Sequence, residues 1–319
     1  MITTVFTWPK KPTSETEFES LMSAVDAHLA SQSLTPFQRP LNVPRLFWEA
    51  FSWEGSILPP DELADQAGYD GEILMAKAHR WYTHVFGEKL NGDWVIGYAA
   101  YALAGTTWKV RFPVIYGQCR LFIDKDISNR GVSIGSNRQS ASYNIICSVE
   151  ALEQGLATRL SAKSLEEFWT FYTSTYRAFE WRKRYCNGHD LFGQAESDYA
   201  SSVDDLLNRR YAQSRWASSQ AVEKMLKAIL AMSNVAFPKG GKDGHNLIAL
   251  SDLLYQAHGA KLRHDILNLV HCSPAVRYGE ESTSKDQAIT ANHSVLGAIE
   301  MLIGNRKIEM LLSPNSCKS

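Results

Sequence analysis

The stretch RWASSQAVEKMLKAILAMSN, residues 215–234, decides how the second half of the chain is interpreted. Two adjoining faces of the helix it predicts are apolar, one with Ala217, Ala221, Met225, Ala228 and Met232, the other with Val222, Leu226, Ile229 and Leu230. Small residues let a neighbouring helix approach closely, and larger ones fill a core. Only Ser219, Glu223 and Lys227 remain as a polar strip, in which Glu223 precedes Lys227 in the orientation that favours an ion pair. The pattern predicts a central bundle helix with one polar strip left over.

Helical periodicity continues on both sides of this stretch. The segments with that pattern are residues 198–211, 246–259, 261–271 and 284–303. Short links between consecutive helices favour an antiparallel bundle of five helices. We therefore predict an all-α bundle over residues 196–306 and a tail over residues 307–319. The segment CNGHDLFGQ, residues 186–194, is the predicted linker before the bundle.

The residues before 190 predict a separate α+β domain. Phe18, Leu21, Met22, Val25 and Leu29 have helical spacing. Ser14 and Glu17 fit a capping box before them. Pro36, Pro40 and Pro44 then indicate an irregular segment, and a second helix is expected over residues 72–86.

A β region follows that second helix. Its five short segments, rich in β-branched and aromatic residues, are residues 93–103, 107–115, 117–124, 131–136 and 142–149. Short links favour antiparallel pairing of neighbours, so we predict one antiparallel sheet of about four or five strands with helices against one side. A long helix over residues 164–185 closes the domain, with Ser164 and Glu167 as a capping box. Its aromatic stripe (Leu165, Phe168, Trp169, Tyr172, Tyr176, Phe179) predicts a packing face.

Composition limits the classes of function. The net charge of −1 shows no overall basic character of the kind that announces nucleic-acid binding, although a local basic face is compatible with it. The five cysteines include no C-x-x-C pair, which favours a reduced intracellular protein over a disulfide scaffold. No apolar run reaches the ~18 residues of a membrane span. We predict a cytoplasmic protein without membrane contact.

Three motifs follow one another in the bundle. Gln220, Glu223, Lys224 and Lys227 form a Gln-x-x-Glu-Lys-x-x-Lys pattern, which resembles that of a helix in the HEPN family. The segment GHNL, with His245 and Leu247, matches a His-x-Leu entry into the next helix, and VRYGE carries an Arg277–Tyr278 pair. The order and spacing match over residues 198–303, about a third of the chain, and residues 1–190 resemble no family known to us.

One function implied by the resemblance is metal-independent cleavage of RNA, for which such domains pair and use Arg-x(4–6)-His. Here Arg263 and His271 are separated by seven residues, one too many. On one helix they would lie about 80° apart around the axis and roughly 12 Å along it. His264 and His271, seven positions apart, would share a face. The predicted catalytic residues of this alternative are Arg263, His264 and His271, without a metal or other cofactor.

The resemblance also implies non-cleaving members that bind nucleotides or dock a partner protein. For this function, which we rank first, the predicted nucleotide- or RNA-binding residues are Arg215, Lys224, Lys227, Arg277 and Tyr278, with Trp216 as a second aromatic for base stacking. The expected partners are a second copy or another protein bound through the bundle, and RNA or a nucleotide. A bacterial defence or toxin–antitoxin setting is expected from the family. The third alternative is a sensor whose aromatic-rich first domain binds a ligand.

Other candidate sites are weaker. Residues 124–131 lack the Gly and Glu of a calcium loop, so Asp124 and Asp126 indicate a polar turn. Cys186 and His189 have no second pair to complete a zinc site. The Gly- and Lys-rich residues 237–246 lack the ending of a phosphate-binding loop. No metal site is predicted.

Overall fold

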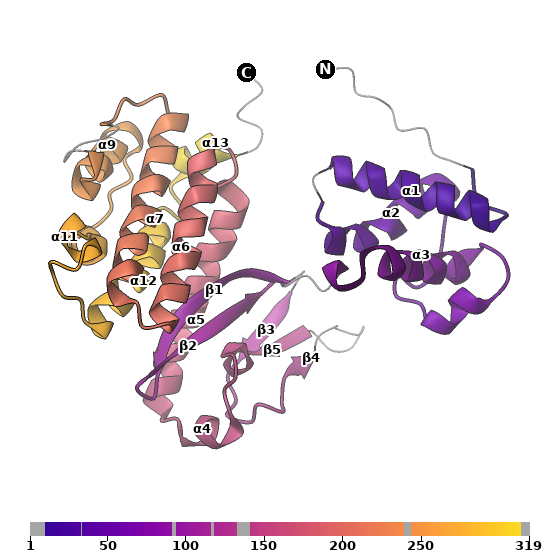
Figure 1. The fold of residues 1–319 in the computed structure, drawn as a ribbon, viewed down its shortest axis with the longest axis horizontal. Coiled ribbons are helices and arrows are strands. Elements are labelled where there is room, and N and C mark those ends of the chain that lie inside the picture. Colours follow the sequence, from indigo (N-terminus) through magenta and orange to yellow (C-terminus); the bar gives the residue numbers. More distant parts are fainter. Residues whose placement is uncertain are drawn as a thin grey trace. The chain divides into compact units, whose positions relative to one another are not determined.

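The chain forms two compact units, Met1–Asp93 and Trp94–Ser319 (Figure 1). The structure is a computed structural model that describes residues 10–32, 34–90, 94–115, 118–132, 141–238 and 244–313. Each unit has its own cluster of buried apolar side chains. The predicted boundary near residue 190 lies within the second unit and stays a prediction about independent domains.

The first unit is helical in the part of it that the structure describes. It contains α1 (Glu15–Ser31), α2 (Arg39–Phe51) and α3 (Gly71–Phe86), with 3₁₀ turns at Pro36–Gln38, Asp61–Asp65 and Gly87–Leu90. The predicted helices correspond to α1 and α3. The Ser14 side chain accepts a hydrogen bond from the Glu17 N–H, as predicted, but the Glu17 carboxylate accepts from the Thr13 N–H at 2.7 Å rather than completing the box.

The prediction of an irregular segment after residue 36 was wrong, because residues 39–51 form α2. Pro40 lies in the first turn, where an N–H has no partner within the helix and its absence costs little. Pro44 lies inside the helix and removes one backbone hydrogen bond. Val43, Leu46 and Phe47 bury the apolar face of α2 in the core of the first unit, which offsets that loss.

The second unit begins with two small sheets. Strands β1 (Val95–Leu103) and β2 (Thr106–Pro113) form an antiparallel hairpin. Its two-residue turn has positive φ at Ala104 and Gly105, the combination that matches the twist of the strands. Strands β3 (Cys119–Phe122), β4 (Gly131–Val132) and β5 (Ala141–Asn144) form the other sheet in the order β3-β5-β4.

The predicted α+β class is confirmed, but two details of the predicted sheet were wrong. The strands form two sheets instead of one, and β3 pairs with β5 in parallel. The parallel pair arises because β4 lies on the far side of β5, so β3 and β5 are neighbours in space without being neighbours in sequence. A bridge between Val110 and Val149 links the hairpin to the segment after β5.

The long helix α5 (Ala162–Tyr185) packs its aromatic stripe against the hairpin, as predicted. Tyr172 stacks on Phe112 of β2 with ring centroids 4.6 Å apart, and Phe179 lies so close to Gly97 of β1 that a Cβ there would meet its ring at 2.9 Å. The helix begins earlier than predicted, because Ser161 is the N-cap and accepts from the Ser164 N–H. The capping box at Ser164 was therefore wrong.

The five predicted bundle helices correspond to α6 (Asp190–Leu207), α7 (Tyr211–Met232), α9 (Leu247–His258), α10 (His264–Val270) and α12 (Lys285–Glu300), and the structure adds the short α11 (Pro274–Arg277) and α13 (Arg306–Leu312). The short α4 (Gln154–Arg159) precedes α5. The tail predicted over residues 307–319 was wrong for its first part, because α13 lies there and buries Ile308 and Leu312. Figure 1 shows α7 beside α6, with α9 and α11 at the edge of the bundle. Because α6 begins at Asp190, the linker is shorter than the predicted residues 186–194.

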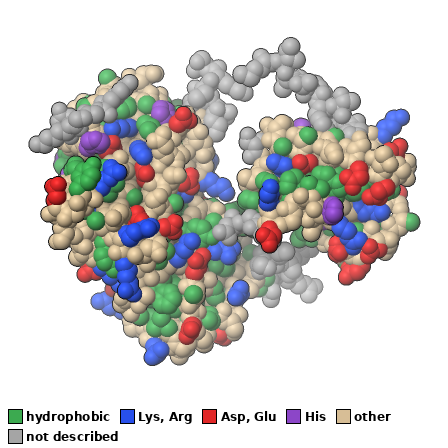
Figure 2. All heavy atoms as spheres, in the orientation of Figure 1, with side chains coloured by type: hydrophobic (Ala, Val, Ile, Leu, Met, Phe, Trp, Pro, Cys, Tyr) green, Lys and Arg blue, Asp and Glu red, His purple; other side chains and the backbone are tan. Residues whose placement is uncertain are grey.

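Charges on the molecular surface agree with the balanced composition. Figure 2 shows acidic and basic side chains interspersed over the visible face. Of the helices that the structure describes, none has the length and apolar character needed to cross a bilayer.

Candidate functional site

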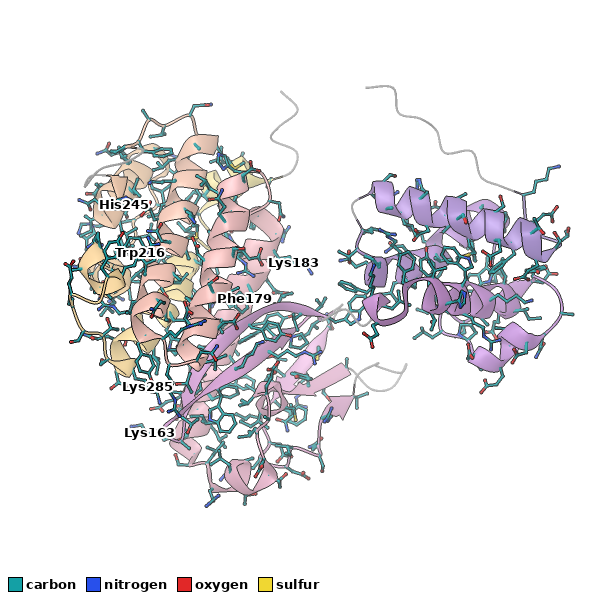
Figure 3. The ribbon with its side chains drawn as sticks, viewed as in Figure 1. Lys163, Phe179, Lys183, Trp216, His245 and Lys285 are labelled. Carbon is teal, nitrogen blue, oxygen red and sulfur yellow. The ribbon has the colours of Figure 1, made fainter. Side chains whose placement is uncertain are left out.

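A pocket of about 660 Å³ opens beside the middle of α7. Its walls come from Trp216, Gln220 and Glu223 of α7, from residues 245–248 at the start of α9, and from residues 267–274, which run from α10 into α11. Figure 3 shows Trp216 and His245 on the same side of the bundle, near α9 and α11. Apolar side chains such as Leu247, Ile248 and Leu267 make much of the lining. This size and mixed lining are typical of small-molecule sites.

The carboxylate of Glu223 lies at the centre of a buried network in this pocket. The Glu223 side chain is 5% exposed, and Lys227 Nζ lies 2.7 Å from its Oε1. His245 Nδ1 lies 2.9 Å from Oε2, and Gln220 Nε2 donates to the same oxygen at 3.3 Å. Both oxygens therefore have partners, which a buried carboxylate needs. The predicted Glu223–Lys227 pair is confirmed.

The polar strip of α7 was predicted to remain outside the packed faces of the helix, but the structure covers it. Ser219, Glu223 and Lys227 are all buried. The reason is that α9 and the segment after α10 cover this side of α7 and form the pocket over the strip. Helical periodicity identifies polar positions, but it does not show that another segment will cover them.

A stack of aromatic and cationic groups lies at one side of the pocket. The Arg277 guanidinium lies over the Trp216 ring, 5.1 Å from its centroid, and 5.9 Å from the centroid of Tyr278. Tyr278 itself is 72% exposed. Arg215 donates to the backbone oxygen of His271 at 3.2 Å. Two predicted binding arginines are thus next to residues that line the pocket.

The two predicted binding lysines lie elsewhere. Lys224 pairs with Asp198 of α6 at 2.6 Å and lines a second hollow of about 820 Å³ between α6 and the segment before it. Lys227 is held by Glu223 and is absent from the described lining of the first pocket. Of the predicted binding residues, Arg215 contacts His271, Arg277 contacts Trp216, and Tyr278 contacts Arg277.

The predicted catalytic residues are only partly brought together. His271 lines the pocket, whereas Arg263 and His264 do not. Arg263 forms an exposed pair with Asp265, and His264 Nε2 lies 3.4 Å from Asp252 of α9. The helix predicted over residues 261–271 is shorter, since Arg263 is the N-cap of α10 and His271 its C-cap. The helical angle expected between Arg263 and His271 therefore does not apply.

Sequence reasoning missed His245 as a site residue. It entered only as part of a family motif, although the structure places it beside both Glu223 and the pocket. Glu223 and His245 are 22 positions apart and lie on different segments, so no local spacing shows that they meet. The one available signal was that both belong to the matched motifs.

No cluster of three His, Cys, Asp or Glu side chains suited to a metal occurs in the parts of the chain that the structure describes. Asp124 instead accepts hydrogen bonds from the Asp126 N–H and the Asn129 amide within one turn. Burial raises the pKa of the Cys272 thiol at the pocket, which disfavours the thiolate. The polar groups in the described lining of the pocket are imidazole, carboxylate, hydroxyl and amide side chains.

Comparison with known proteins identifies the helical region. Residues 189–304 match the family model of the HEPN domain, so the carboxy-terminal third of the chain is a HEPN domain. The amino-terminal region has no such match. No curated protein and no solved structure matches the chain. A HEPN domain implies a function related to nucleotides or RNA.

Proposed function

We propose that the HEPN domain binds a nucleotide, free or as a unit of RNA, in the pocket beside α7. The observation that carries this proposal is the Trp216 ring, which lines the pocket with the Arg277 guanidinium over it. An aromatic side chain offers a face on which any base stacks, and arginine recognises phosphate.

The distribution of polarity around the pocket supports the same ligand. Its described lining contains apolar residues, two histidines and the Glu223 carboxylate, but no lysine or arginine. Arg215 and Arg277 lie just outside it, each in contact with a lining residue. A base and its sugar fit an interior without lysine or arginine, and the phosphate then meets the cations outside.

The test is calorimetric titration of the full chain with ribonucleoside monophosphates and short single-stranded RNA. Trp216→Ala is expected to weaken binding by about 10-fold, because one base–aromatic stack contributes ~1–3 kcal/mol. Trp48→Ala is the matched control, since Trp48 belongs to the first unit and is 63% exposed. Equal affinities for wild type and Trp216→Ala would refute the site.

A charge variant separates phosphate recognition from stacking. Arg277→Gln is expected to weaken binding of all four nucleotides to a similar extent and to reduce the dependence of affinity on salt, because phosphate contacts carry no base information. Retention of the full salt dependence would assign the phosphate to other residues.

Cleavage of RNA is the second candidate, favoured because His245 and His271 line one pocket. Two imidazoles are able to act as general base and general acid on a ribose 2′-hydroxyl and the leaving oxygen. We would incubate tRNA and single-stranded RNA with the protein in EDTA. His271→Ala is expected to abolish cleavage, whereas His264→Ala, outside the pocket, is expected to retain it. Cleavage unchanged in His271→Ala would remove this candidate.

Pairing of the HEPN domain with a second copy or another protein stays a prediction, as does a defence or toxin–antitoxin role. Sedimentation of the purified chain across a range of concentrations tests the first. The sensor role of the amino-terminal residues also stays a prediction, and titration of intrinsic tryptophan fluorescence with cell-extract fractions tests it.

A further inference from the structure

Residues 54–65 of the first unit form a loop, here named the acidic loop, whose backbone is held against α3. The Ser56 N–H donates to Glu72 Oε1 at 2.8 Å, and His79 Nε2 lies 2.9 Å from the Ile57 oxygen. Glu72 and His79 both belong to α3. The first half of the loop is therefore fixed by side chains of a helix, although it has no regular secondary structure of its own.

Two neighbouring aliphatic side chains stay exposed on this fixed backbone. Ile57 and Leu58 are 58% and 59% exposed. Pro59 and Pro60 follow them, and the ring of a proline fixes its φ. A loop that is already ordered in the free protein loses little conformational freedom on binding, so more of the energy gained from burying its apolar groups appears as affinity. The aliphatic pair is thus suited to be covered by apolar groups of a partner.

Carboxylates flank the aliphatic pair on both sides in the sequence. Those of the acidic loop are Glu54, Asp61, Glu62 and Asp65, and all four residues are exposed. Arg80 of α3 pairs with both Asp61 and Asp65, so its single charge balances one of these two carboxylates. No ion pair of Glu54 or Glu62 occurs among the residues that the structure describes. The acidic loop therefore combines exposed apolar side chains with an excess of negative charge.

The net charge of the whole first unit has the same sign. Met1–Asp93 contains 13 acidic and seven basic residues, whereas Trp94–Ser319 contains 21 acidic and 26 basic residues. The balanced charge of the chain thus conceals a net charge of −6 on the first unit and +5 on the second. A unit with this negative charge repels the phosphates of nucleic acids and of anionic lipids and attracts a cationic partner.

We propose that the acidic loop is a docking site for a basic segment of another protein. Lysine or arginine side chains of that segment pair with Glu54 and Glu62, and apolar side chains between them cover Ile57 and Leu58. The charges speed the encounter and select the partner, while the covered aliphatic side chains slow its dissociation. This site is separate from the proposed nucleotide pocket, which belongs to the second unit.

The test selects peptides from a random display library on the full chain. Selected peptides are expected to carry a net positive charge and apolar residues, and they are then synthesised for calorimetry. The double variant Ile57→Ser/Leu58→Ser is expected to bind them about 10-fold more weakly, because it removes the apolar surface that they cover. Leu41→Ser is the matched control and is expected to bind like wild type, since Leu41 is a 47% exposed aliphatic residue of α2 outside the loop.

A charge variant tests the second half of the proposal. Glu54→Gln/Glu62→Gln keeps the size of both side chains, and neither carboxylate has an ion pair to lose among the described residues. This variant is expected to associate more slowly with the selected peptides and to show a weaker dependence of affinity on salt. Circular dichroism and thermal unfolding verify that each variant is folded.

Four outcomes would overturn the proposal. Selection that yields no binding peptide, or peptides without an excess of lysine and arginine, would remove the basic partner. Equal affinities for wild type and Ile57→Ser/Leu58→Ser would place the binding elsewhere. An unchanged salt dependence in the charge variant would exclude pairing with Glu54 and Glu62. Sedimentation that shows self-association of wild type but not of Ile57→Ser/Leu58→Ser would identify a second copy of the chain as the occupant instead.

Discussion

Two charged pairs in the HEPN domain have similar geometry and very different surroundings. Lys227 Nζ and Glu223 Oε1 are 2.7 Å apart, with side chains 10% and 5% exposed. Arg263 Nε donates to Asp265 Oδ1 at 3.0 Å, with side chains 69% and 58% exposed. Water screens the exposed pair and competes for its hydrogen bonds, whereas removal of one buried partner leaves an uncompensated charge. Distance alone therefore does not indicate how much either pair matters to the fold.

The largest expected effect comes from breaking the buried pair. Glu223→Ala leaves the Lys227 ammonium without its partner in a side chain that is 10% exposed. We expect the free energy of unfolding to fall by about 3 kcal/mol, the usual cost of removing one member of a buried ion pair. Urea unfolding followed by circular dichroism measures this change. A loss as small as that of a surface substitution would show that water reaches Lys227 freely.

A double substitution sharpens the comparison by removing both charges. Glu223→Leu combined with Lys227→Met is expected to lose much less stability than Glu223→Ala, because apolar replacements of similar volume avoid the cost of desolvating the ions. The His245 ring loses its hydrogen-bond partner in the same variant, so nucleotide binding is expected to weaken even where stability is retained. Stability and binding would then be separated in one variant.

His293 is a partly buried titratable group, and no charged partner for it occurs among the residues that the structure describes. Its Nε2 lies 2.8 Å from the Ala100 oxygen of β1, and Phe171 of α5 packs against its ring. Burial lowers the pKa of His293. The neutral form is thus favoured in the folded state, so its contribution to stability is present above the ordinary pKa of about 6.5 and is lost as pH falls through the folded value.

We therefore expect the free energy of unfolding to decrease on acidification below pH ~6.5. His293→Phe should be less stable than wild type at pH 8, where the Ala100 hydrogen bond is lost, yet should show a flatter dependence on pH. Urea unfolding at a series of pH values gives both quantities. Parallel curves for the two proteins would assign the acid sensitivity to other groups.

The smallest expected effect concerns the exposed pair on α10. Arg263 lowers the pKa of the Asp265 carboxyl through their hydrogen bond, which would favour the fold above the ordinary carboxyl pKa and be lost as pH falls. Both groups face solvent, so this contribution is strongly screened. Asp265→Asn is expected to leave the urea midpoint at pH 7 and the acid-unfolding curve unchanged within error. A clear shift would show that this pair has a structural role comparable to that of Glu223 and Lys227.

Much of the architecture could be predicted from the sequence, because helices are encoded by local periodicity. The helix at residues 215–234, the packing role of the aromatic stripe on α5 and the α+β class followed from the spacing of apolar residues. The order of strands did not, since the parallel pairing of β3 with β5 depends on β4 lying beyond β5. The prolines were also misleading as signs of an irregular segment, because burial of Phe47 and its neighbours offsets the backbone hydrogen bond that is lost at Pro44.

The site was less predictable than the fold. Charge and aromaticity identified Arg215, Arg277, Tyr278 and His271 as candidates near one region. Arg263 and His264 were grouped with His271 because all three were assigned to one helix, but α10 ends before His271. The contact between Glu223 and His245 depends on how the start of α9 folds over α7, which local spacing does not encode.

The shared core of the second unit has a consequence for how the chain can be divided into fragments. Buried residues of the hairpin, of α5 and of the HEPN helices belong to one cluster that extends from Ile96 to Leu312. A gene fusion that transferred only residues 189–304 would leave apolar surface of α6 and α12 without its cover, because both helices contact β1. A fragment that keeps these contacts has to include residues from about 94 onward.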